Sequence, residues 1–116
     1  MRLWSGGFLY GFFFKKGIYD ASYLNDFIAD WFKEAKAMQH YSIGVANVMT
    51  GLFESYDETL SHEDTIKLLQ ASVTFSGVTP AIEALGSLFF AGGMIYENDV
   101  TAAINHCEEM GYSEDQ

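Results

Sequence analysis

The first residue that could do chemistry is Ser5, in the run Trp4-Ser5-Gly6-Gly7. A serine hydroxyl acts as a nucleophile when a strand, a strained turn and a helix hold it exposed, with a glycine two residues before it. Residue 3 is leucine, and the residues before Ser5 leave no room for a strand. The sequence therefore does not predict Ser5 to be a catalytic nucleophile.

The three histidines, His40, His62 and His106, are the next candidates, because imidazole is the commonest metal ligand. No two of them have the spacing of metal ligands on one helix or turn. His62 stands at the start of an expected helix, and His106 is expected on the solvent side of the last helix. The sequence therefore predicts no metal site and no cofactor.

An aromatic cluster stands near the start of the chain. Its rings are followed by Lys15-Lys16 and belong to Trp4, Phe8, Tyr10, Phe12, Phe13 and Phe14. Aromatic rings flanked by lysines can lie in a membrane interface, so contact with a lipid or membrane surface is one interpretation. The favoured interpretation is that the rings pack beneath a loop or cover the site in the complete domain, because apolar clusters belong to a core more often than to an interface. The apolar run is too short to span a bilayer, which needs about 20 residues.

The composition and net charge of the chain limit the kinds of partner that it could bind. The 116 residues include 16 acidic and 6 basic ones, which gives a net charge of -10 and argues against a nucleic-acid partner. Anionic headgroups would be repelled too, so membrane contact should be apolar. Hydrophobic residues make up 49% of the chain, which is enough for the core of one domain. With one cysteine and no convincing signal peptide, cytoplasmic residence is expected, peripheral at membranes or lipid droplets.

The periodicity of apolar residues predicts the helices. A helical turn is expected over residues 10–14, and Asp20 or Ser22 should begin a longer helix. The buried stripe of that helix is predicted from its three- and four-residue spacing: Leu24, Phe27, Ile28, Trp31, Phe32 and Ala35. Ser61 to Asp64 has the form of a capping box, which predicts a third helix. A last helix from about residue 99 should bury one apolar face: Val100, Ala103, Ile104 and Cys107.

Three further segments are predicted to be strands. Residues 41–48 are apolar without clean alternation, which is typical of a strand covered on both faces, as in a parallel sheet. A turn at Thr50-Gly51 should lead to a second strand over residues 52–56, and residues 88–90 should form a short strand. Strands that alternate with helices predict an α/β fold.

Several short motifs, in their order and spacing, resemble one known family. They are Gly17-Ile18-Tyr19-Asp20, Val45-Ala46-Asn47-Val48-Met49-Thr50-Gly51, Gln70-Ala71-Ser72, Phe89-Phe90-Ala91-Gly92-Gly93 and Gly111-Tyr112. Together they resemble the C-terminal part of the patatin-like phospholipase (lipid acyl hydrolase) domain, over roughly the whole chain, residues 1–116. The resemblance implies a three-layer α/β fold with a mainly parallel sheet flanked by helices. The glycines themselves, Gly92 and Gly93, predict a turn with unusual backbone angles after the strand over residues 88–90.

The resemblance implies a parent activity, the hydrolysis of acyl esters of phospholipids or neutral lipids by a serine–aspartate dyad. Ala91 occupies the position of the family's aspartate, and the family's Gly-x-Ser-x-Gly motif, which lies upstream of the matched part, does not occur here. Asp99, the nearest carboxylate, and Asn98 are expected to begin the last helix rather than to replace that aspartate. We therefore expect a truncated hydrolase domain that is inactive alone.

Two other interpretations stay open. The chain could be a non-catalytic scaffold that binds a lipid surface or a protein partner, or a fragment with no role of its own. A parallel sheet without its first strands would expose backbone amides along one edge. Marginal stability and self-association through that edge are therefore expected.

Overall fold

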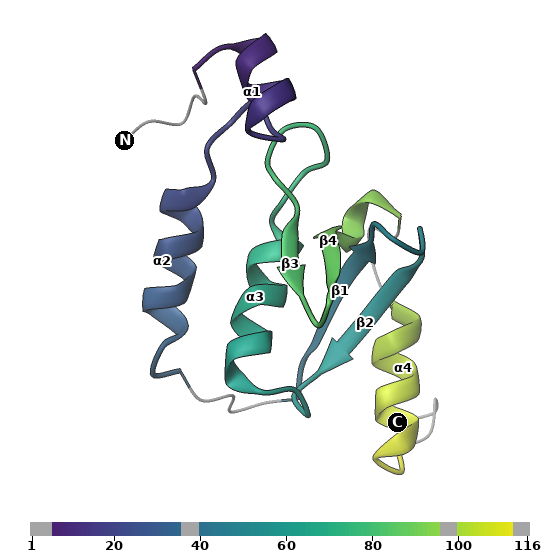
Figure 1. Ribbon diagram of the computed structural model, residues 1–116. Helices are drawn as coiled ribbons and strands as arrows, with labels where there is room; N and C mark the ends of the chain where they lie inside the picture. The colour runs from purple at the N-terminus through teal and green to yellow at the C-terminus, as the bar shows by residue number, and fades with distance from the viewer. Residues whose placement is uncertain (1–5, 36–39, 96–99, 113–116) are drawn as a thin grey trace.

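The computed structural model describes residues 6–35, 40–95 and 100–112, and these form a mixture of helices and strands (Figure 1). The elements are α1 (Phe8–Phe14), α2 (Ser22–Phe32), β1 (Ser42–Asn47), β2 (Phe53–Asp57), α3 (His62–Ser72), β3 (Ile82–Ala84), β4 (Ser87–Ala91), the 3-10 helix η1 (Gly92–Met94) and α4 (Val100–Glu109). The predicted helices and strands are confirmed within a few residues. The three-residue strand β3 was not predicted.

The described strands form one sheet in the order β2-β1-β4-β3, and every neighbouring pair is antiparallel. The prediction of a mainly parallel sheet is therefore wrong for this part of the chain. Short turns impose the antiparallel direction on the β1–β2 and β3–β4 pairs. Gly51, with φ of 71°, closes the β1–β2 turn, and Leu85-Gly86, both with positive φ, form a two-residue hairpin loop between β3 and β4.

The core lies between α3 and one face of the sheet. Val45, Leu68 and Phe89 are almost completely buried there, and Ile43, Ala71 and Ala84 complete the cluster. The opposite face of β1 is covered in part by Phe53 and by η1, which explains why β1 lacks clean alternation although its sheet is antiparallel. Ser61 caps α3 as predicted, because its Oγ accepts a hydrogen bond from the Asp64 backbone amide at 3.2 Å.

Helix α2 lies against α3 rather than against the sheet (Figure 1). Ile28 is buried, and the Gln70 side-chain amide donates a hydrogen bond to the Asn25 carbonyl at 2.8 Å. Phe32 is half-buried, and the other members of the predicted buried stripe are exposed, including Phe27 at 52% and Trp31 at 70%. One neighbouring helix can cover only a narrow stripe of α2, so the prediction of a fully buried stripe is wrong.

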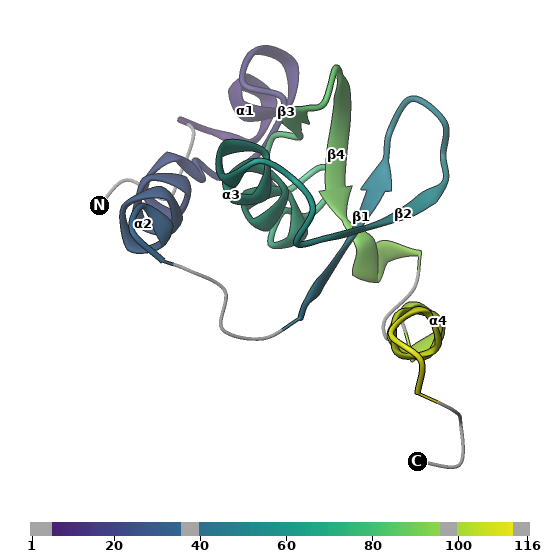
Figure 2. The same cartoon turned by 90° about the horizontal axis from the view of Figure 1, so that it is seen from below.

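Helix α4 lies on the other side of the sheet from α3 (Figure 2). It contains no buried residue, and Ala102 and His106 are its least exposed side chains. The predicted buried face, which includes Ile104 and Cys107, is exposed, and His106 turns toward the sheet. The face of α4 that lies toward the sheet therefore differs from the predicted one, because the histidine of α4 lies beside a carboxylate at the end of the sheet.

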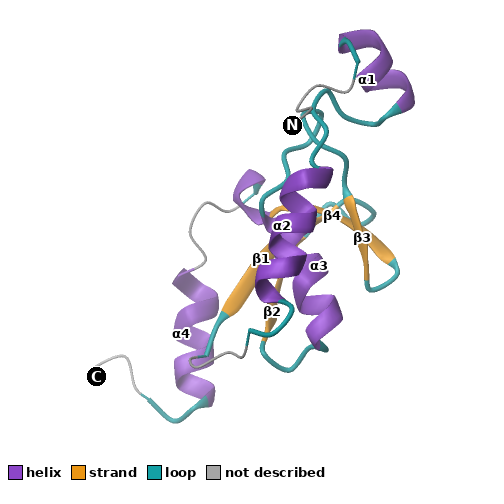
Figure 3. Ribbon diagram, turned by 90° about the vertical axis from the view of Figure 1, so that its left-hand side faces the viewer, coloured by secondary structure: helices purple, strands orange, loops and turns teal. Residues whose placement is uncertain are grey.

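The molecule is elongated, with extents of 52 × 31 × 24 Å. Its radius of gyration of 15.8 Å exceeds the value of about 13 Å expected for a compact domain of this length. Helix α1 projects from one end, away from the sheet (Figure 3). This shape leaves many large apolar side chains of the described residues in contact with solvent.

Candidate functional site

Ala91 is the last residue of β4 and is 6% exposed. It pairs with Val45 of the central strand, and its amide donates a hydrogen bond to the Thr74 carbonyl at 3.1 Å. Its methyl group has no acceptor and no titratable proton. Ala91 therefore supplies no general base.

Gly92 lies against the backbone of the central strand. A Cβ atom on Gly92 would stand 2.6 Å from the carbonyl carbon and oxygen of Gly44 and 2.7 Å from the Phe53 ring, whereas one on Gly93 would meet open space. Neither Gly92 nor Gly93 has a positive φ, so the prediction of a turn with unusual backbone angles is wrong. Gly92 is required for a close approach of two backbones rather than for an unusual conformation.

Asn47, which is 7% exposed at the end of β1, is hydrogen-bonded to the following turn and to both neighbouring strands. Its Oδ1 accepts hydrogen bonds from the Met49 amide at 2.9 Å and from the Ser87 hydroxyl at 2.8 Å, and its Nδ2 donates to Glu54 at 2.8 Å. The Tyr56 hydroxyl donates to the other Glu54 oxygen at 2.5 Å. Burial, and then this bond to Glu54, raise the pKa of Tyr56 to about 12. The network is satisfied internally, so we assign it a structural role.

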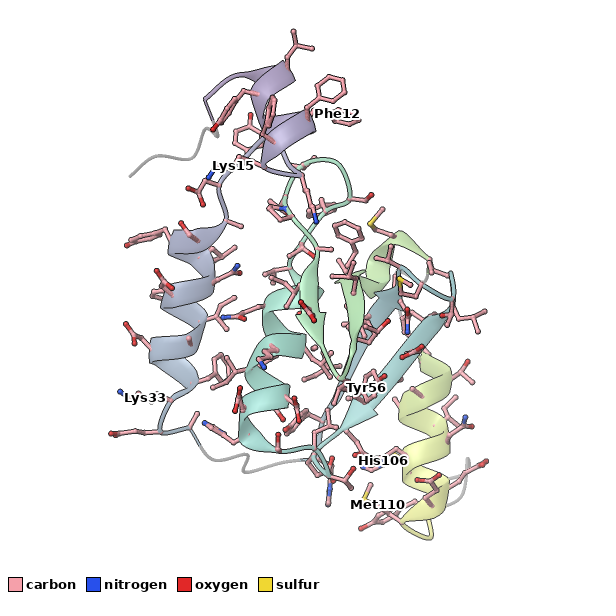
Figure 4. All side chains as sticks on the ribbon, viewed as in Figure 1. Phe12, Lys15, Lys33, Tyr56, His106 and Met110 are labelled. Atoms are coloured by element: carbon pink, nitrogen blue, oxygen red, sulfur yellow. The ribbon has the colours of Figure 1, made fainter. Side chains whose placement is uncertain are left out.

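The aromatic rings of α1 are exposed. Phe12, Phe13 and Phe14 are 56%, 69% and 74% exposed, and Phe14 stacks on Tyr10 with ring centroids 5.3 Å apart. Figure 4 shows Phe12 at the projecting end of the molecule and Lys15 just below α1. These four rings therefore do not pack beneath a loop. Trp4 and the side chain of Phe8, also predicted to belong to the cluster, lie outside the described part.

His40 and His106 converge on one carboxylate, which the sequence did not predict. His40 Nδ1 is hydrogen-bonded to Glu58 Oε1, and His106 Nε2 lies 3.5 Å from the same oxygen. The hydrogen bond from His40 is the main cause that lowers the pKa of Glu58 to about 2. The hairpin of β1 and β2 was the feature from which the proximity of His40 and Glu58 could have been predicted. Its first register pair, Ser42 and Asp57, brings residues 40 and 58 to the same end of the hairpin. Nothing in the sequence placed α4 beside that end.

Ser61 Oγ donates a hydrogen bond to Asp64 Oδ2 at 2.6 Å, but this serine–carboxylate pair belongs to the N-terminal cap of α3, where Ser61 Oγ also accepts from the Asp64 amide. The histidine side chains of the described residues contact carboxylates, one another and the Lys33 carbonyl, and none is hydrogen-bonded to a serine hydroxyl or to Cys107. Ser5, Asn98 and Asp99 lie outside the described ranges. The described part of the chain therefore contains no arrangement for acyl transfer.

None of the helices within residues 6–35, 40–95 and 100–112 is long and apolar enough to cross a bilayer. Comparisons of the chain with protein-family models, with curated proteins and with solved structures found no match.

Proposed function

We propose that this chain is a patatin-like lipid acyl hydrolase scaffold that attaches to a lipid surface and does not hydrolyse esters by itself. The observation that carries the proposal is the exposed group of phenylalanines on the projecting helix α1. An apolar group at the end of an elongated molecule can enter a lipid surface without disturbing the core. The two parts of the proposal, relationship and lipid contact, have separate support.

The relationship to patatin-like hydrolases is supported by the way in which two of the resembling motifs meet. The motif that ends at Gly51 contains the second half of β1, and the motif that ends at Gly93 contains most of β4. The two strands are neighbours, with Val45 paired to Ala91, although the motifs lie far apart in sequence; the pair is antiparallel, whereas the resemblance implies a mainly parallel sheet. Helices on both sides of the sheet, α3 and α4, are in keeping with the layered fold that the resemblance implies (Figure 2).

The absence of hydrolysis follows from the chemistry of Ala91. Loss of the orienting carboxylate in a serine hydrolase lowers turnover by a factor on the order of 10⁴. Alanine supplies no substitute acceptor, and the serine–aspartate pair of Ser61 and Asp64 is the N-terminal cap of α3. We therefore assign the chain a binding role rather than a catalytic one.

Lipid contact is supported by the free energy that burial of the phenylalanine side chains of α1 would contribute. Full burial of a phenylalanine side chain is worth about 1.5–3 kcal/mol, so half-burial of Phe12, Phe13 and Phe14 would contribute on the order of 3 kcal/mol. The net charge of -10 opposes approach to anionic headgroups. We therefore expect a preference for zwitterionic or neutral lipid, with little dependence on salt.

The test is flotation of the full chain with phosphatidylcholine vesicles. We expect the chain to float with the vesicles, and the double substitution Phe13→Ser and Phe14→Ser to reduce the bound fraction at least about tenfold, because it removes two exposed apolar side chains. Tyr112→Ser is the matched control, since Tyr112 is 58% exposed and follows α4 at the other end of the molecule. Equal binding of the double variant and the unaltered chain would disprove the role of α1.

A second candidate is attachment to a protein partner through α2. Leu24, Phe27 and Trp31 lie exposed on that helix, and the rings of Phe27 and Trp31 have centroids 5.8 Å apart. Such a stripe suits a helix that fits into an apolar groove. Absence of vesicle binding by a folded, unaltered chain would favour this candidate over the lipid surface.

A further inference from the structure

Three potential metal ligands from separate segments meet at one end of the sheet. His40 precedes β1, Glu58 follows β2, and His106 belongs to α4. One nitrogen of each histidine and one oxygen of Glu58 all lie within 4.8 Å of one another. The histidine rings are 5.5 Å apart between centroids, with an angle of 66° between their planes.

The spacing of these donors suits a small divalent cation. Ligands at about 2.0–2.1 Å around a tetrahedral ion are separated by roughly 3.3 Å. His106 Nε2 and Glu58 Oε1 are 3.5 Å apart, whereas His40 Nδ1 and Glu58 must separate somewhat to admit an ion. His40 is 62% exposed in its side chain, so its ring has room for this movement.

His106 carries a polar atom that the protein leaves unsatisfied. Its Nε2 is buried and has no hydrogen-bond partner, because 3.5 Å to Glu58 is too long for a good bond. A buried nitrogen without a partner is unfavourable, and an ion bound between Nε2 and Glu58 would satisfy it. On the other side of the ring, Nδ1 lies 3.8 Å from Glu109 Oε2, which is too far for a hydrogen bond.

The types of donor select the class of metal. Two imidazoles and one carboxylate favour first-row transition metals such as Zn²⁺, whereas Ca²⁺ and Mg²⁺ prefer oxygen ligands alone. Three protein ligands leave a fourth position for water or another ligand. His106 and Glu109 also line a pocket of about 260 Å³ with Ser55 and Asn105.

We infer that His40, Glu58 and His106 form a binding site for a divalent transition-metal ion of the zinc class, which fastens α4 to the sheet. Helix α4 has no buried residue of its own, so its described contacts with the sheet are few. An ion held by His106 and by the residues that precede β1 and follow β2, at the open end of the β1–β2 hairpin, would join the helix to that hairpin. This site is independent of Ala91 and of the rings of α1.

The test is titration of the full chain, free of any polyhistidine tag, with Zn²⁺ and with Co²⁺. We expect one equivalent to bind, visible absorption bands of coordinated Co²⁺, and a rise in Tm of about 10 °C when zinc exceeds its Kd about 100-fold, reversed by a chelator. Hydrogen exchange in α4 should slow in the same sample. His40→Ala should weaken binding more than about 100-fold, because even groups behind a ligand are worth 10–100-fold.

Two variants separate loss of the site from loss of the fold. His40→Ala removes an exposed side chain and should leave the Tm without metal nearly unchanged. His62→Ala is the matched control, since His62 is exposed, is hydrogen-bonded to the Lys33 carbonyl rather than to Glu58, and should leave zinc affinity unchanged. If zinc does not bind, or if His62→Ala weakens binding as much as His40→Ala does, the three residues form only an ion-pair cluster.

Discussion

Gly92→Ala is expected to destabilise the protein by about 3 kcal/mol, the upper end of the usual range for forcing an extra carbon into a packed core. The new methyl group would lie 2.6 Å from the Gly44 carbonyl and 2.7 Å from the Phe53 ring. A flexible side chain could move aside, but the Gly44 backbone belongs to the central strand. The sheet must therefore shift or η1 must detach. Urea and thermal unfolding should show a fall in Tm of roughly 10 °C.

Gly93→Ala is the matched control for this prediction. A Cβ atom on Gly93 meets nothing within 4 Å, and its φ is not positive, so alanine fits there without strain. Its free energy of unfolding should stay within about 0.5 kcal/mol of that of the unaltered chain. Equal stability of both variants would show that η1 does not press against β1 in solution.

Phe89→Ala is expected to lower the free energy of unfolding by about 3–5 kcal/mol, as is usual when a buried phenylalanine is truncated. Phe89 is 1% exposed on the face of β4 toward α3, and its ring meets that of Tyr56 edge-on at 6.1 Å. Since the total free energy of unfolding of a small domain is only about 5–15 kcal/mol, a large fraction of the Phe89→Ala molecules should be unfolded. Circular dichroism in a urea series measures the change.

Phe75→Ala serves as the control for the core, because Phe75 is the same residue type but is 61% exposed. Its removal should change the free energy of unfolding by less than about 0.5 kcal/mol. If Phe75→Ala proved as harmful as Phe89→Ala, the assigned core between α3 and the sheet would be wrong.

The sequence predicted local elements well and their assembly less well. The Ser61 cap of α3 and the apolar spacing of α2 are local signals, so those helices could be located. Strand direction is set by which strands pair, and residues 41–48 have the composition of a strand buried on both faces in either kind of sheet. Strand β3, only three residues between Pro80 and Gly86, is too short to show a pattern.

The faces of the outer helices could not be predicted, because periodicity identifies an apolar stripe and not what covers it. On α2 only Ile28 is buried, and on α4 His106 rather than Ile104 turns inward. For the same reason the sequence missed the meeting of His40, Glu58 and His106. Their proximity depends on the docking of α4, which leaves no periodic signal. The aromatic cluster of α1 could be predicted, since its members are neighbours in sequence.

The most direct test of the proposed function measures fatty acid release by the chain while it is bound to phosphatidylcholine vesicles. We predict that the chain floats with the vesicles and releases no fatty acid above the rate of buffer alone, because Ala91 supplies no base. Ser5→Ala should behave identically in both measurements. Fatty acid release by the unaltered chain that Ser5→Ala abolishes would contradict the proposal and identify an active hydrolase.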